Sequence, residues 1–156
     1  MVFAADCPVL FDRLDEQLRN TPQPAQNLFA NIIGSVCTRI PVLSYTAKAD
    51  RLARLVETGA WTDAALALIE LELPAWSVRR LVRESGEWLC SLSRQPNIPP
   101  EIDDGVDAVH EVLPLAVLRA FVEARRRCIV ASETTVFAVP QLQPAASHFV
   151  SCDNYA

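Results

Sequence analysis

The sequence predicts an α+β fold, in which a helical pair and a β-hairpin pack with a third long helix. Apolar residues recur at helical spacing in residues 49–56 and again in 115–122, which indicates two amphipathic helices. Residues 76–93 carry the turn signal and the flanking apolar residues of a hairpin. An all-α bundle is the alternative, because the same stretch can also be arranged as an amphipathic helix.

Length and composition support a single domain. The chain has 156 residues, of which 51% are hydrophobic and 21% charged, and this is enough to bury a sizeable core. We expect a globular domain at residues 45–139. A weakly patterned segment at 1–44 precedes it, and a mobile tail at 140–156 follows it.

Residues 1–44 contain two apolar stretches. The first predicts a short helix that ends where two prolines follow, and its apolar face consists of Val9, Leu10, Leu14 and Leu18. The second, at residues 28–36, predicts either a short helix that ends at Gly34 or a strand.

The globular part begins with two helices joined by a short link. The apolar face of the first helix consists of Ala49, Leu52, Ala53 and Val56. Gly59 is placed to close this helix in a left-handed conformation. The second helix spans residues 64–73, with Thr62 as its N-cap and Trp61 packed on Leu66. Because this helix is apolar on nearly every side, we expect it in the core, packed on the first helix as a helical hairpin.

The hairpin prediction for residues 76–93 depends on Gly86. Residues 84–86 form a three-residue loop with this glycine at the left-handed position. The flanking cross-strand pairs are then Arg83 with Glu87, Val82 with Trp88, and Leu81 with Leu89. A helix would instead place Gly86 in its interior at a cost of about 1 kcal/mol, so the hairpin is preferred.

The remaining elements follow a proline-rich loop. Residues 101–109 predict a short helix or turn. A long helix begins at Pro114, and its apolar face consists of Leu115, Leu118, Phe121 and Val122. We expect residues 125–127, three arginines, in its last turn, where cations complement the helix dipole. Residues 134–139 predict a strand.

Four stretches within residues 47–126 resemble those of a group of small uncharacterised bacterial proteins. The stretches are Gly59-Ala-Trp-Thr-Asp-Ala-Ala-Leu-Ala-Leu, Arg79-Arg80, Gly86-Glu-Trp-Leu-Cys90-Ser-Leu-Ser-Arg94-Gln95 and Ala120-Phe-Val-Glu-Ala-Arg-Arg126. The resemblance favours the hairpin over the helix for residues 76–93. It implies no activity, because the group has no assigned function.

Charge and cysteine usage restrict the partners. The net charge is −5, and 13 arginines and Lys48 are spread evenly among 19 acids, so we do not expect nucleic-acid binding. No apolar run approaches the length of a transmembrane helix, and residues 1–7 lack the features of a secretory signal. Five scattered cysteines without a CxxC pair are typical of a reduced compartment, which predicts a cytoplasmic protein.

Most reactive motifs are absent from the sequence. There is no GxGxxG, GxxxxGK[ST] or GxSxG pattern, so we expect neither a nucleotide cofactor nor a serine nucleophile at an elbow. Cys90 or Cys128 with His110 is the one plausible nucleophile–base dyad. The alternative is that both cysteines are packing residues. Nothing in the spacing of these three residues predicts a zinc site, and we expect no catalytic residue and no bound metal.

Acidic residues concentrate between the proline-rich loop and the long helix. They are Glu101, Asp103, Asp104, Asp107 and Glu111. If this stretch is helical, Asp103, Asp107 and Glu111 share a face that can bind a divalent ion opposite another acidic helix. A solvated helix face is the preferred interpretation.

The best candidates for a binding surface are arginines and tryptophans of the hairpin: Arg79, Arg80, Arg83, Arg94, Trp76 and Trp88. We predict a non-enzymatic interaction or regulatory module that presents this surface to an acidic protein partner or to its own copy. The alternative function is a small-molecule binding protein or enzyme that holds an anionic ligand with the same arginines. The structural alternative is pairing of these arginines with Glu84 and Glu87.

Overall fold

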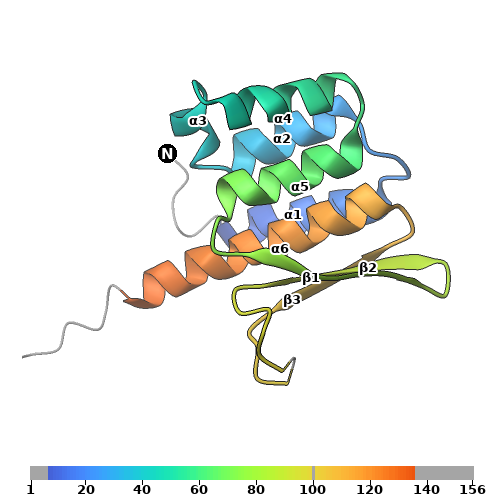
Figure 1. The fold of residues 1–156 in the computed structure, drawn as a ribbon, viewed down its shortest axis with the longest axis vertical. Coiled ribbons are helices and arrows are strands. Elements are labelled where there is room, and N and C mark those ends of the chain that lie inside the picture. Colours follow the sequence, from blue (N-terminus) through green and yellow to red (C-terminus); the bar gives the residue numbers. More distant parts are fainter. Residues whose placement is uncertain (1–6, 100, 136–156) are drawn as a thin grey trace, which may run out of the picture.

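A three-stranded antiparallel sheet carries all the helices on one of its faces (Figure 1). The computed structural model describes residues 7–99 and 101–135. The helices of these residues are α1 (Cys7–Asn20), α2 (Gln26–Val36), α3 (Ile40–Leu43), α4 (Ala47–Glu57), α5 (Trp61–Glu72) and α6 (Leu113–Thr135). The strands are β1 (Ser77–Glu84), β2 (Glu87–Ser93) and β3 (Val106–His110). The α+β prediction is confirmed, and the all-α bundle is excluded.

The helices form two layers above the sheet. Helix α6 lies on the sheet with α1 and α5 beside it, and α2, α3 and α4 lie farther from the sheet (Figure 1). Helices need an apolar face against another layer, and α6 is buried from both sides by this arrangement. None of the described helices combines the length and the apolar character needed to cross a bilayer.

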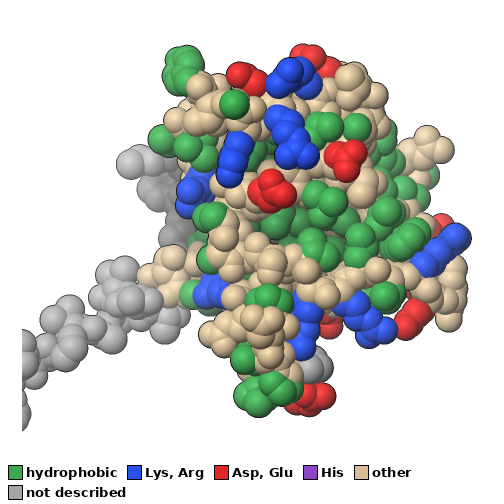
Figure 2. All heavy atoms as spheres, viewed as in Figure 1, with side chains coloured by type: hydrophobic (Ala, Val, Ile, Leu, Met, Phe, Trp, Pro, Cys, Tyr) green, Lys and Arg blue, Asp and Glu red, His purple; other side chains and the backbone are tan. Residues whose placement is uncertain are grey.

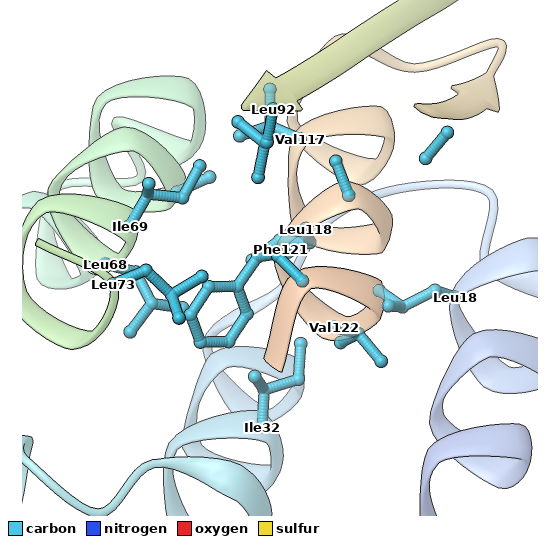
Figure 3. Close-up of a cluster of buried hydrophobic side chains, with 14 of the residues drawn as sticks. Leu18, Ile32, Leu68, Ile69, Leu73, Leu92, Val117, Leu118, Phe121 and Val122 are labelled. Atoms are coloured by element: carbon cyan, nitrogen blue, oxygen red, sulfur yellow. The ribbon is translucent and has the colours of Figure 1, made fainter. Parts of the chain in front are cut away.

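The core is continuous through these layers. Phe121 of α6 lies at its centre, with Leu68 of α5, Ile32 of α2 and Leu18 of α1 around it (Figure 3). All four side chains are fully buried. Helices α1 and α2 therefore contribute to the same core as the later elements, and truncating Phe121 to alanine should cost about 3–5 kcal/mol.

The first two helices agree in part with the sequence pattern. Helix α1 buries Leu14 and Leu18, as its spacing predicts, but it also buries Phe11, which the predicted face did not include, and Val9 is exposed. Helix α2 resolves the open choice for residues 28–36 in favour of a helix. The helix does not end at Gly34 but continues to Val36. Gly34 is an exposed position inside the helix, with room around it.

The helical hairpin of α4 and α5 is confirmed. Gly59 closes α4 with φ of +73°, and α5 is buried over most of its length. The predicted start of α5 is wrong, because the helix already begins at Trp61 and Thr62 is not its N-cap. Trp61 lies in the first helical turn and stacks on Phe29 of α2, with ring centres 5.6 Å apart.

The β-hairpin is confirmed, but its register differs by one residue. Glu84 pairs with Glu87 and Arg83 with Trp88, so the loop consists of Ser85 and Gly86 alone. Both loop residues have positive φ, +54° and +91°, as a two-residue type I′ turn requires. This turn matches the twist of the strands, which explains why it replaces the predicted three-residue loop.

The prediction of a helix or turn for residues 101–109 holds only for a turn at residues 101–102, and it is wrong from Val106 onward, where the chain forms β3. Val106, Ala108 and His110 of β3 are buried, and Asp107 and Val109 alternate with them toward the other face. Strand β3 pairs with β2 along its full length. The pairing makes this short segment a strand, because β2 supplies its backbone hydrogen bonds and α6 covers its buried face.

Helix α6 is longer than the sequence pattern indicates. It continues to Thr135, so the arginines at 125–127 lie in its middle and not in its last turn. The strand predicted for 134–139 is wrong where it can be tested, because Thr134 and Thr135 are helical. Residues 136–139 and the tail predicted at 140–156 lie outside the described residues.

Candidate functional site

The two arginine–tryptophan pairs of the hairpin lie at its opposite ends. The Arg83 guanidinium is 5.9 Å from the centre of the Trp88 ring, and that of Arg94 is 4.9 Å from the centre of the Trp76 ring. Trp88 and Arg94 are six residues apart on one extended segment, which corresponds to about 20 Å. The structure therefore separates the predicted surface into two patches.

The patch near α6 is anchored in the interior. Trp76 is buried, and its indole Nε1–H points at the Cys128 Sγ at 3.3 Å. The exposed Arg94 lies over the outer side of this indole, with its Nη2 3.5 Å from the same sulfur. The buried ring fixes the position of the exposed cation, so Arg94 is presented in a defined place.

A β-bulge directs Arg79 and Arg80 to the sheet face that carries no described helix. The register of β1 shifts between Val78 and Arg80, so Arg79 is the extra residue. Arg79 donates to the Asp103 carboxylate at 2.8 Å and to the carbonyl of Ile98 at 2.7 Å. It therefore holds the loop between β2 and β3 and is not available to a partner.

Arg80 and its surroundings are electrostatically balanced. Its guanidinium pairs with Glu84 at 3.1 Å, and both side chains are exposed, so this pair contributes little stability. A cavity of about 210 Å³ lies beside Arg79 and Arg80, but Asp103 and Asp107 line it as well. The two carboxylates offset the two arginines, which weakens the attraction of the cavity for an anion.

The arginines of α6 tie the helix to three other elements. Arg125 donates to the carbonyl of Val36, and Arg126 pairs with Asp12 at 2.6 Å. Arg127 pairs with Asp104 at 2.8 Å. Successive helical residues point about 100° apart, which is why one run of arginines reaches three directions. The expectation that they complement the end of the helix dipole is wrong, because they lie in the middle of α6.

Glu72 forms a buried anion site that sequence reasoning missed. Its carboxylate accepts hydrogen bonds from the backbone N–H groups of Thr38, Arg39 and Ile40 at 2.5 to 3.1 Å, and Arg125 lies 3.7 Å away. The carboxylate thereby satisfies the backbone donors at the start of α3 and just before it. A signal was present, because Glu72 is an acidic residue within an apolar helix.

The candidate cysteine–histidine dyad is not assembled. Burial raises the pKa of Cys90 to about 12, with a further rise from Asp107, which is the opposite of what a nucleophile needs. His110 Nδ1 accepts the backbone N–H of Val112 at 2.9 Å. Cys128 lies with Trp76 at the other end of the sheet. In the described part of the chain, no group of three or more His, Cys, Asp or Glu could hold a metal ion.

Two polar hollows line the side of the molecule formed by α1, β3 and α6. They have volumes of about 480 and 620 Å³, and Arg19 and Arg119 border both. Arg119 Nε donates to Asp15 at 2.9 Å, and Arg19 also pairs with Asp15. Burial raises the pKa of Asp15, but the hydrogen bond and charge of Arg119 and the charge of Arg19 outweigh it, so the pKa is lowered. Opposite charges already neutralise each other in these hollows.

A second group of cations lies on the α3–α4 side, where the sequence indicated only the polar face of a helix. Figure 2 shows Lys and Arg side chains over α4 with Asp and Glu side chains among them. The exposed cations are Arg39, Lys48, Arg51 and Arg54. None of them forms an ion pair within residues 7–99 and 101–135.

Comparison with protein-family models, curated proteins and solved structures finds no match to this chain. This agrees with a sequence resemblance that extends only to a group without an assigned function. The function is therefore inferred from the geometry of the hairpin and its surroundings.

Proposed function

We propose that the protein is a non-enzymatic interaction module that presents the arginine–tryptophan pairs of its hairpin to an acidic protein segment. One observation supports this most strongly. Arg83 and Arg94 are exposed and have no carboxylate partner in the described residues, yet each rests on a tryptophan ring. Tryptophan and arginine are enriched where interfaces derive most of their binding energy.

The contrast with the other arginines supports the choice. Arg79, Arg119 and Arg125 each have a carboxylate partner and a backbone carbonyl to donate to. The positive charges of these three arginines are neutralised by carboxylates of the same molecule. Arg83 and Arg94 retain theirs, and a guanidinium held on an aromatic ring loses little freedom when it binds a carboxylate.

The alternative, a small anionic ligand or an enzyme, has less support. The hollow beside the hairpin is small and lined by both signs of charge, and the Cys90 thiol has a raised pKa.

Cys7, Cys37, Cys90 and Cys128 are free thiols, which supports a reducing, cytoplasmic setting.

A peptide of alternating glutamate and leucine tests the proposal. An extended chain places alternate side chains on opposite faces, so its glutamates form one acidic row. We expect fluorescence anisotropy of the labelled peptide to show salt-dependent binding to the full chain. An Arg83→Glu/Arg94→Glu variant should bind on the order of tenfold more weakly.

The matched control is Arg51→Glu/Arg54→Glu, which makes the same change of charge on the exposed face of α4. This control should bind the peptide as the natural chain does. An equal loss of peptide binding in both variants would show that binding depends only on the overall charge of the protein, and this result would contradict the proposal. Absence of binding by the natural chain would contradict it as well.

A further inference from the structure

Strand β1 is an edge strand whose outer side is open. The sheet order is β1-β2-β3, so β1 lies at one edge, and β2 is the one strand of the described residues that pairs with it (Figure 1). In the described residues, the backbone groups of 78–84 form hydrogen bonds with β2 alone. An open edge offers a row of backbone donors and acceptors to another strand.

The opposite edge of the sheet is closed. The Arg119 guanidinium donates to the carbonyl of Val109, and that of Arg127 donates to the carbonyl of Gly105 at 2.8 Å. Two arginines of α6 thus occupy one carbonyl within β3 and one directly before it. Such blocking is a known means of preventing strand addition, so β1 is the edge of this sheet that can take a partner.

The sequence of β1 is complementary to itself. When two copies pair antiparallel about Val82, Arg80 of each lies opposite Glu84 of the other. Arg80, Val82 and Glu84 share the face that carries no described helix. Centring the pairing on Arg83 would oppose this arginine with its own copy, and centring it on Leu81 would oppose Arg79 with Arg83. Like charges directly opposite each other are destabilising.

The direction of the backbone groups agrees with this register. Glu84 and Glu87 close the two-residue turn, so they direct their backbone groups toward each other. Backbone groups alternate along a strand, and Leu81 and Arg83 therefore direct theirs to the open edge. In a pairing centred on Val82, Leu81 of one copy faces Arg83 of the other, and the open donors and acceptors meet.

The apolar side chains of the open face also continue across this junction. Val82 pairs with Leu89, and Leu89 pairs with Val109, so the three form one row across the sheet. Val82 of a second copy would extend the row. We propose that two copies of the chain pair antiparallel through β1 about Val82 and form one continuous six-stranded sheet. This deepens the proposed function, on which it rests, by naming a second copy as a partner of the hairpin.

A charge exchange tests the register. Arg80→Glu and Glu84→Arg each place like charges opposite each other in the dimer, and the double variant Arg80→Glu/Glu84→Arg restores opposite charges. Sedimentation of the full chain at a series of concentrations should show a dimer. Its dissociation constant should rise at least about fivefold in each single variant and recover in the double variant. Circular dichroism confirms that each variant is folded.

Cross-linking tests the centre of symmetry. Residues opposite each other in a pair without backbone bonds have Cβ atoms about 4.5–5.5 Å apart, close enough for a disulfide to form after a small adjustment. Val82→Cys should therefore give a covalent dimer on mild oxidation. Val78→Cys is the control, because Val78 is exposed on the same strand but not opposite its own copy. The yield of covalent dimer from Val78→Cys should not exceed that of the natural chain, which carries the same native cysteines.

The outcomes separate the two proposals. A chain that is monomeric at all concentrations, or a dimer that the charge exchange leaves unaffected, would overturn pairing through β1. If the acidic peptide still binds and Arg83→Glu/Arg94→Glu abolishes this binding, the interaction module stands without the dimer. Absence of peptide binding by the natural chain would refute the proposed function itself, whether or not the chain dimerises.

Discussion

Glu72 and Arg125 place their charged atoms 3.7 Å apart in the interior, where the Glu72 side chain is fully buried. The carboxylate is not satisfied by this arginine alone, because the backbone N–H groups at the start of α3 donate to it as well. The pair joins α5 and α6 to the segment between α2 and α3. A buried charge with this many partners is stable as a unit and costly to leave incomplete.

Removing the charge of Glu72 should destabilise the fold. We expect Glu72→Gln to lower the free energy of unfolding by about 2–4 kcal/mol in urea titrations, because the amide cannot accept all of the backbone donors. Arg125→Met should cost less, since the backbone donors still satisfy the carboxylate. Glu70→Gln is the control on the exposed side of α5 and should stay within about 0.5 kcal/mol. An equal loss for Glu70→Gln and Glu72→Gln would contradict this assignment.

The buried thiols should react slowly in the folded protein. Burial raises the pKa of Cys37 to about 12, and Glu72 raises it further while Arg125 opposes the rise. The pKa of Cys90 is also about 12. Since the thiolate is the reactive form, iodoacetamide at pH 8 should label both far more slowly than the half-buried Cys7 and Cys128, as peptide mass spectrometry can measure. Denaturant should remove the difference, and rapid native labelling of Cys37 would contradict its burial.

Asp15 should make stability depend on pH. Its pKa in the folded protein is lowered from 3.8, so its contribution is present above that value and is lost as pH falls through the lower, folded one. Asp15→Asn should reduce the free energy of unfolding at pH 7 by about 1 kcal/mol or less. The difference from the natural chain should shrink below pH 3.8. Glu16→Gln, exposed on the same helix, should show no such convergence.

The turn of the hairpin gives a test of backbone conformation. Gly86 has φ of +91°, so Gly86→Ala should destabilise the protein by about 1 kcal/mol. Ser85 has φ of +54°, which asparagine adopts more readily, so Ser85→Asn should raise the melting temperature. Gly34→Ala is the contrast: nothing lies within 4 Å of the added carbon and the site is helical, so it should stabilise. Destabilisation by Ser85→Asn would contradict the type I′ turn.

Local patterns predicted most of the helices and the hairpin, whereas the details that failed depend on distant partners. Gly86 indicated a turn, but Ser85 gave no sign that it would also take a positive φ, and the register therefore differs by one residue. Strand β3 was missed because it has only five residues and one of them, Asp107, is acidic, so the pattern is weak and only pairing with β2 makes the segment a strand.

The candidate site shows the same limit. The sequence identified the arginines and tryptophans of the hairpin, and their role in binding stays a prediction. It could not distinguish Arg79, which holds Asp103, from Arg83, which rests on Trp88. The two side chains have the same chemistry, and the β-bulge that directs them to different faces of the sheet is not visible in the sequence. Glu72 was visible only as an acid in an apolar helix.

By itself the sequence determined that the stretches at residues 49–56, 64–72 and 115–122 are helical, where the chain turns back at Gly86, and which reactive motifs are missing. These features depend on periodicity and on backbone preferences that act over a few residues. Tertiary structure alone decided which arginines are neutralised, which edge of the sheet is closed, and where a buried carboxylate finds its donors. Such properties depend on atoms that are far apart in the chain and are brought together only when the core packs.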